Sequence, residues 1–221
     1  MEKLFAGAFF ALFMSFGLGV GTTYALTSFT LNDGNGFAAD QDYATIDITL
    51  TGNTLHVVVT TLPGFGIFGN GAGNGAFGFN VVGSTAVTFA NILPNSGGGA
   101  CNSGNGGNFD GFGGFELSLE CGSASQNISS LSFDLTRPGT PFTSENDIVE
   151  DNAGGNNFAA HICVRDGDGC SATGFATTGG GSGAGPGGVA VTATQVPEPS
   201  SVLLIGSGLL ALARYARRKR S

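Results

Sequence analysis

The residue types most able to do chemistry come together once in this chain, between residues 161 and 170. The run contains His161, Cys163, Asp166, Asp168 and Cys170. We interpret it as a β-hairpin whose Asp-Gly pairs form the turn and whose cysteines clamp the strands as a disulfide. A calcium site on Asp166 and Asp168 is one alternative, although no further set of oxygen ligands follows. A zinc site on His161 and the two cysteines is another, although no fourth ligand is evident.

Catalytic groups are scarce elsewhere. The second histidine, His56, falls on the outward face of an expected hairpin, and no Gly-x-Ser-x-Gly nucleophile elbow occurs. A cluster of acidic residues is expected to be a solvated loop rather than a catalytic pair. It comprises Glu145, Asp147, Glu150 and Asp151. We therefore predict that the chain is not an enzyme and that it uses no cofactor, with Ca²⁺ as the exception left open.

The first 25 residues have the layout of a secretory signal peptide. A charged start, Met1 to Lys3, precedes an apolar stretch from Leu4 to Val20, and small residues stand at Thr23 and Ala25. We predict export through the Sec machinery and cleavage by signal peptidase after Ala25. The alternative is an uncleaved N-terminal anchor.

The four cysteines all lie in the exported part of the chain, where disulfides persist. Four cysteines allow three connectivities. We favour pairing between neighbours in the sequence, Cys101 with Cys121 and Cys163 with Cys170. The larger of these loops would stabilise the fold by roughly 3 kcal/mol in the chain-entropy model.

The middle of the chain is strongly acidic. Between the two end segments it carries 14 acidic residues against Arg137 and Arg165, a net charge of −12. Such a surface repels phosphate backbones, so nucleic acid is excluded as a partner.

The same region reads as strands. Residues 45–51 and 54–60 alternate around Gly52-Asn53, which predicts a hairpin with Ile46, Ile48 and Leu50 facing the core alongside Leu55, Val57 and Val59. Shorter runs follow at residues 76–82, 86–92, 115–120, 130–136 and 157–164. Short strands with turn residues between them predict an all-β, antiparallel β-sandwich or jelly roll at residues 26–177. We expect glycine-rich loops at 64–75 and 97–114, and a flexible glycine-rich linker at 178–195.

The tail, residues 196–221, has three parts. Val196, Pro197, Glu198 and Pro199 form an extended motif, because proline fixes φ and disfavours helix in the residue before it. An apolar stretch from Val202 to Ala213 predicts a short transmembrane helix. The basic end is expected to stay cytoplasmic and consists of Arg214, Arg217, Arg218, Lys219 and Arg220.

This three-part tail resembles the PEP-CTERM sorting signal of exported bacterial proteins. The resemblance implies recognition by a membrane-embedded exosortase, a cysteine transpeptidase-like enzyme that cuts near the motif. It also implies a transient anchor in the inner membrane and a final place at the cell surface or outside the cell. Proteins of this kind typically occur in Gram-negative bacteria that make exopolysaccharide, and they are associated with biofilm.

From this resemblance and the scarcity of catalytic groups we expect a structural component of the surface or matrix, with exopolysaccharide as a further expected partner. The alternative is a glycan- or calcium-binding β-sandwich module. Against glycan binding, the middle contains no Trp and only Tyr43 as a ring with a polar handle. A hydrolase is the third hypothesis.

Overall fold

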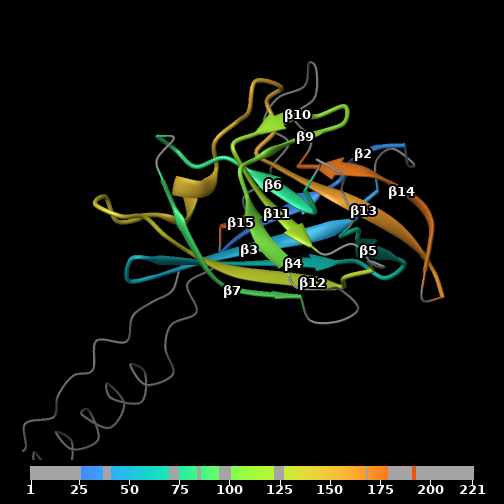
Figure 1. Cartoon of the computed structure of the whole chain (residues 1–221), viewed down its shortest axis with the longest axis horizontal. Coiled ribbons are helices and arrows are strands. Elements are labelled where there is room, and N and C mark those ends of the chain that lie inside the picture. The colour runs from blue at the N-terminus through green and yellow to red at the C-terminus, as the bar shows by residue number, and fades with distance from the viewer. Residues whose placement is uncertain are drawn as a thin grey trace, which may run out of the picture.

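The computed structural model describes residues 26–36, 41–69, 75–83, 86–94, 101–121, 127–167, 169–178 and 191–192, and these residues form an all-β fold (Figure 1). The strands are β1 (Leu26–Leu31), β2 (Asp33–Asn35), β3 (Ala44–Thr51), β4 (Thr54–Thr61), β5 (Phe65–Ile67), β6 (Phe77–Phe79), β7 (Thr88–Pro94), β8 (Cys101–Gly104), β9 (Gly107–Phe109), β10 (Gly113–Phe115), β11 (Leu117–Cys121), β12 (Ser130–Thr136), β13 (Phe158–Asp166), β14 (Gly169–Thr177) and β15 (Val191–Thr192). One 3₁₀ turn, η1, spans Glu145–Ile148.

The β3–β4 hairpin confirms the prediction made from alternation. Thr51 pairs with Thr54 across the turn, and Gly52 has φ +59°, which a glycine adopts without strain. Ile48 and Val57 oppose each other and are fully buried, whereas His56 on the other face is exposed. Leu50 is the one expected core residue that stays partly exposed, and it packs against the edge of the core.

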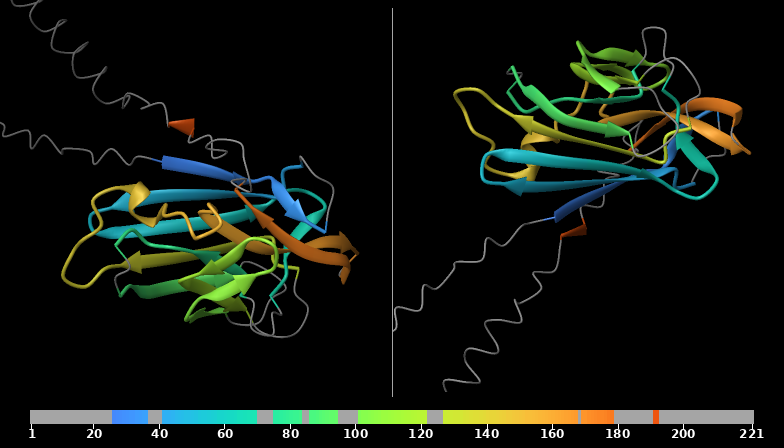
Figure 2. Two further views of the ribbon diagram at one scale, coloured as in Figure 1. Left: turned by 90° about the horizontal axis from the view of Figure 1, so that it is seen from above. Right: turned by 60° about the horizontal axis from the view of Figure 1, so that its bottom comes forward.

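Two antiparallel sheets make the sandwich. Sheet A has the order β15-β1-β3-β4-β12-β7, and sheet B has the order β2-β14-β13-β6-β11-β8 with β5 also paired to β13. Figure 2 shows the two sheets as stacked layers from two further directions. The predicted antiparallel β-sandwich is therefore confirmed for the described residues.

Phenylalanine fills the space between the sheets. Phe133 of β12 lies 6.1 Å from Phe77 and 5.6 Å from Phe79, both of β6, measured between ring centroids. All three side chains are fully buried, as is Phe158 of β13. Aromatic rings bury large apolar areas and pack well at these separations. Alternate residues of each strand thus form the core and leave polar residues outside.

The prediction that residues 64–75 and 97–114 are loops was wrong in part. They contain β5, β8, β9 and β10, and the β9–β10 hairpin lies on the outer face of sheet B as a third layer. Phe109 of β9 packs where Gly78 of β6 has no side chain, since a Cβ there would lie 2.3 Å from the Phe109 ring. Phe109, Phe112, Phe115, Ala159 and Phe175 form a second buried cluster in this layer. Glycine here makes room for packing, which composition alone does not reveal.

Both disulfides connect neighbours in the sequence, the pairing that we favoured. Cys101 of β8 lies directly opposite Cys121 of β11, and their sulfurs are bonded. Cys163 and Cys170 bridge the β13–β14 hairpin. The hairpin interpretation of residues 161–170 is therefore confirmed, with Gly167 at φ +59° in the turn.

The predicted signal peptide (1–25), the sorting tail (196–221) and most of the predicted linker (178–195) lie outside the described residues. The exceptions in the linker are Thr178, which is buried, and the pair Val191 and Thr192, which forms β15. The described part of the chain contains no helix with the length and apolarity of a membrane span.

Candidate functional site

The outer face of sheet A is a polar surface made mainly of residues with hydroxyl groups. Strand register places directly opposed side chains on the same face, so these residues form rows across the sheet. One row contains Thr88, Thr136, Thr54 and Thr51. Another contains Ser130, Thr60, Thr45 and Thr30. Threonine suits exposed strand positions because its branched Cβ favours extended backbone while its hydroxyl remains solvated.

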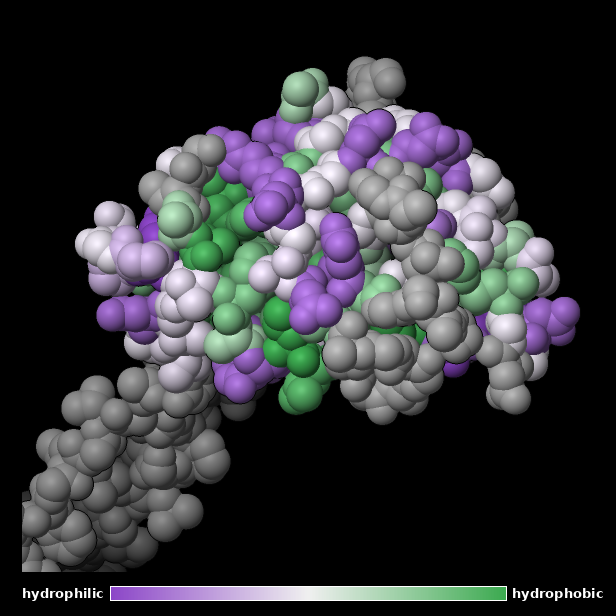
Figure 3. All heavy atoms as spheres, viewed as in Figure 1, coloured by the Kyte–Doolittle hydropathy of each residue, from purple (hydrophilic) through white to green (hydrophobic). Residues whose placement is uncertain are grey.

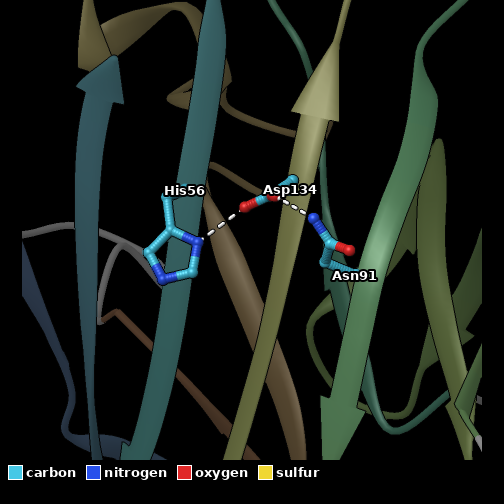
Figure 4. Close-up of polar contacts among 3 residues, drawn as sticks. All are labelled: His56, Asn91 and Asp134. Carbon is cyan, nitrogen blue, oxygen red and sulfur yellow. Dashed lines mark hydrogen bonds and ion pairs between the residues drawn. The ribbon is translucent and has the colours of Figure 1, made fainter.

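Between these rows lies the most organised polar cluster of the face, formed by His56 of β4, Asp134 of β12 and Asn91 of β7 (Figure 4). Asp134 Oδ1 is 2.6 Å from His56 Nδ1, and Asn91 Nδ2 donates to Asp134 Oδ2 over 2.6 Å. His56 and Asp134 are directly opposed in the strand register. The His56 side chain is 51% exposed and that of Asp134 is 21% exposed, so the cluster is open to solvent.

Asn91 reaches Asp134 because β7 contains a bulge. Leu93 pairs with Ser132 and Ala90 with Asp134, so Asn91 and Ile92 together face the single residue between those partners. Asn91 has φ +50° and is the only described residue other than glycine with a positive φ. Asparagine tolerates this left-handed conformation better than most residues. The bulge aims the amide of Asn91 along the outer face, where it adds nothing to the core.

The cluster also sets the protonation state of its carboxyl group. Burial alone raises the pKa of Asp134, but the hydrogen bonds from Asn91 and His56, with the nearby His56 charge, outweigh it and lower the pKa. Asp134 is therefore a carboxylate at neutral pH. Because a carboxylate can only accept, the His56 proton that it receives is on Nδ1, which leaves Nε2 directed away from this contact.

Chemically, the face can form hydrogen bonds with a polyhydroxylated ligand. Hydroxyl rows both donate and accept, and Asp134 retains lone pairs beyond the two hydrogen bonds it already accepts. An oriented imidazole is also the usual partner of a nucleophile or a metal. However, the described residues contain no group of three His, Cys, Asp or Glu side chains that could hold a metal ion.

His161 does not form the zinc site considered from the sequence. Its ring lies 4.4 Å from that of Phe175 and 4.8 Å from that of Phe68, between centroids. Burial lowers the pKa of His161 to about 4, so the ring is neutral at physiological pH. Cys163 and Cys170 are bonded to each other and cannot act as thiolate ligands.

The calcium candidate is only half described. Asp166 is exposed where β13 ends at the hairpin turn, and Asp168 lies outside the described residues. The calcium interpretation therefore stays a prediction.

The acidic cluster at residues 145–151 makes structural contacts. Asp147 accepts from the backbone of Thr143 and Ser144 and forms a capping box with Ser144 at the start of η1. Glu145 accepts from the backbone of Leu50 on β3, and Asp151 from the side chain of Asn157. Only Asp151 is exposed, whereas Glu145, Asp147 and Glu150 are partly buried, so the solvated-loop interpretation holds only in part. The loop is anchored to the sandwich through these bonds.

Beside this loop is an open hollow of about 330 Å³ lined by Asn80, Gly114, Phe115, Glu116, Glu150, Asp151, Asn152 and Ala153. The buried side chain of Asn80 connects the acidic loop to the segment between β10 and β11. Its oxygen accepts a hydrogen bond from the backbone N–H of Glu116, and its amide donates one to the carbonyl of Glu150. The hollow is thus a consequence of how this loop meets β10 and β11.

Sequence reasoning placed His56 on the outer face but did not connect it to Asp134 or Asn91. The alternation of residues 130–136 would place Asp134 outward, but pairing β12 with β4 requires knowing the sheet order. The bulge that brings in Asn91 has no signal in the sequence beyond an asparagine within a strand. The sorting residues Val196 to Pro199 and the basic residues from Arg214 lie outside the described residues.

Comparison with known proteins gives one finding. A family model for the PEP-CTERM protein-sorting motif matches residues 195–220. Comparison with curated proteins found no match, and comparison with solved structures found none. The matched stretch covers the Pro-Glu-Pro tripeptide, the apolar segment and the basic end, so the resemblance of the tail is confirmed. The motif marks the chain as an exported exosortase substrate with a transient membrane anchor.

Proposed function

We propose that this PEP-CTERM-tailed, exosortase-sorted chain is a structural component of the cell surface or extracellular matrix, associated with exopolysaccharide. The sorting motif at residues 195–220 is the observation that carries the proposal. The folded part supports it. A two-sheet sandwich with two disulfides between neighbouring strands of sheet B suits a protein that must persist outside the cell. The excess of acidic side chains on this domain favours solubility there.

Removal of the tail tests the sorting step. We expect the chain lacking Val196 to Ser221 to be exported but released into the periplasm or medium without exosortase processing. In a matched control, Pro197, Glu198 and Pro199 are replaced by alanine while the apolar segment and basic end remain. That variant should stay membrane-bound at its full length. Cell fractionation and intact mass of each product provide the measurement, and an unchanged destination for both variants contradicts the proposal.

We also propose that the domain acts without catalysis. His161 supports this, because its ring is neutral and stacks on the ring of Phe175. Such a group neither donates nor accepts protons readily at neutral pH. His56 is held by Asp134, which is a stabilising contact within the sheet. Turnover of a glycan or peptide that is lost in the His56→Gln or His161→Gln variant would contradict this part of the proposal.

Glycan binding is the second candidate function, and the His56–Asp134–Asn91 cluster favours it. A β-bulge and an asparagine in the left-handed conformation position polar contacts that lie outside the core of the sheet. Bulges and such backbone conformations are associated with functional positions. A glycan array, run with and without Ca²⁺, tests this candidate. Binding lost in Asp134→Asn assigns it to sheet A, whereas Ca²⁺-dependent binding lost in Asp166→Asn with Asp168→Asn assigns it to the β13–β14 hairpin.

A further inference from the structure

The edge of sheet A holds both ends of the folded domain. β1 begins at Leu26, the first residue after the predicted signal peptidase site, and it lies between β3 and β15. β15 is antiparallel to β1, with Thr27 opposite Thr192 and Ser28 opposite Val191. Beyond Thr192 the chain therefore continues toward the same end of β1 at which Leu26 begins. The exit toward the sorting motif and the exit toward the signal peptide lie at one corner of the sandwich.

The distance from this corner to the motif is short. Four residues, Ala193 to Val196, separate β15 from Pro197. Five Cα steps span at most about 17 Å when fully extended. A domain of roughly 150 residues has a radius of gyration of about 15 Å. With β15 in place, the motif is thus tethered within about one domain radius of the sheet edge.

We infer that the processing enzyme acts on this chain while β15 is paired to β1, so that the β1–β15 edge of sheet A faces the enzyme. The inference rests on the proposed exosortase processing and goes beyond it. The enzyme acts on a motif held beside a folded domain, with β15 still paired to β1, rather than on a motif at the end of a long free linker. The cut then leaves β15 as the closing strand of the mature sheet.

A disulfide lock tests whether β15 stays paired during processing. Ser28→Cys with Val191→Cys places cysteines at directly opposed positions, where antiparallel Cα atoms are about 4.5–5.5 Å apart and within disulfide reach. Thr30→Cys with Val191→Cys is the matched control. In this control, Thr30 lies two residues further along β1 than Ser28, a displacement of about 7 Å along the strand. This displacement places the Cα atoms of Thr30 and Val191 beyond disulfide reach. Peptide mapping of the exported precursor identifies the new bond and verifies that the two native disulfides are intact.

The lock is then combined with a shorter tether. Deleting Ala193 and Thr194 leaves the matched motif at 195–220 intact but reduces the reach from β15 to Pro197 to about 10 Å. We expect the locked full-length chain to be cleaved like the wild type, as measured by intact mass. The shortened chain should be cleaved when unlocked, because a two-residue strand can separate, and cleavage should be lost when it is locked.

Three results overturn the inference. The lock fails to form or forms equally in the Thr30 control, the locked full-length chain is not cleaved, or the locked and unlocked shortened chains are cleaved equally. Absence of cleavage in the wild type is a different result, since it contradicts the proposed exosortase processing itself.

Discussion

We expect that adding a single methyl group at Gly78 will disturb the packing of the β9–β10 hairpin against sheet B. Gly78 lies on β6 beneath Phe109, and an added Cβ would meet three ring carbons of Phe109 at 2.3–3.0 Å. Ordinary carbon–carbon contacts are about 3.5–4.0 Å, so the ring must move by roughly 1 Å or more. Phe109 is fully buried and contacts Phe115 and Phe175 at centroid distances of 5.3 and 5.7 Å, so its movement disturbs the whole cluster.

The magnitude follows from these contacts. Overpacking of a buried site costs about 1–3 kcal/mol, so we expect Gly78→Ala to lower the free energy of unfolding by that amount. For a domain of this size, this corresponds to a decrease of about 2–12 °C in Tm. Phe109→Ala removes the ring itself and should cost about 3–5 kcal/mol. Gly114→Ala in β10 is the control, because its nearest neighbour would be 4.0 Å away, and it should be close to neutral.

The assay is a double-mutant cycle by urea unfolding under oxidising conditions that preserve both disulfides. If Phe109 is the obstacle, Gly78→Ala should cost less in the Phe109→Ala background than in the wild type by more than about 0.5 kcal/mol, the deviation from additivity found for independent sites. An equal cost in both backgrounds would refute the reasoning. Gly78 would then matter for its backbone freedom rather than for the space it leaves to the ring.

Four further predictions concern the groups that hold the sandwich and its polar face. His161→Phe should flatten the loss of stability between pH 6.5 and about 4, because only the unfolded wild type takes up a proton on His161 in that window. Equal slopes in pH-dependent urea unfolding would contradict this. Asp134→Asn should destabilise at pH 7 by about 1 kcal/mol, since the contacts are part-exposed, and the difference should disappear as pH falls below about 4 and through the lowered pKa. A difference that does not shrink at all as the pH falls below about 4 would exclude the carboxylate as its cause. Asn91→Ala should cost more than Asn91→Gly, by up to about 1 kcal/mol, because alanine is strained at φ +50°; thermal unfolding of the pair decides it. Replacing Cys101 and Cys121 together with serine should cost roughly 3 kcal/mol by loop entropy, and a loss below about 1 kcal/mol in calorimetry would indicate strain in the native bond.

Exposed hydrophobic side chains lie on β7, at one edge of sheet A. Leu93 on β7 is 61% exposed, and Figure 3 shows hydrophobic residues reaching the surface over this strand, between more polar neighbours. β7 is the last strand in the order of sheet A, and its bulge and terminal Pro94 are features that limit edge-to-edge pairing. The bulge at Asn91 therefore serves both the polar cluster and the protection of the sheet edge.

Prediction from sequence was most successful where side-chain alternation determines the structure. Residues 130–136 were expected as a strand, and β12 has those bounds. The β3–β4 hairpin followed from two alternating runs and a Gly-Asn turn. Local backbone preference and burial agree in these segments, so no distant contact was needed to assign them.

It was least successful in glycine-rich segments. β8, β9 and β10 carry few β-branched residues and were expected to be loops. Their strands form because Phe109 and Phe115 can pack over a sheet whose small residues leave room, and because Cys101 is bonded to Cys121. Such contacts join residues that are distant in sequence, so the composition of the segment does not predict them.

By itself, the sequence revealed the sorting tail of this protein and the pattern of its core, because the tail and the strand alternation are each written in contiguous residues. Only the tertiary structure decided which outward-facing side chains meet. His56, Asp134 and Asn91 come from three strands, and their contact depends on sheet order and on a one-residue bulge. The same holds for β15 beside β1, which joins the two ends of the domain through backbone pairing that no side-chain pattern encodes.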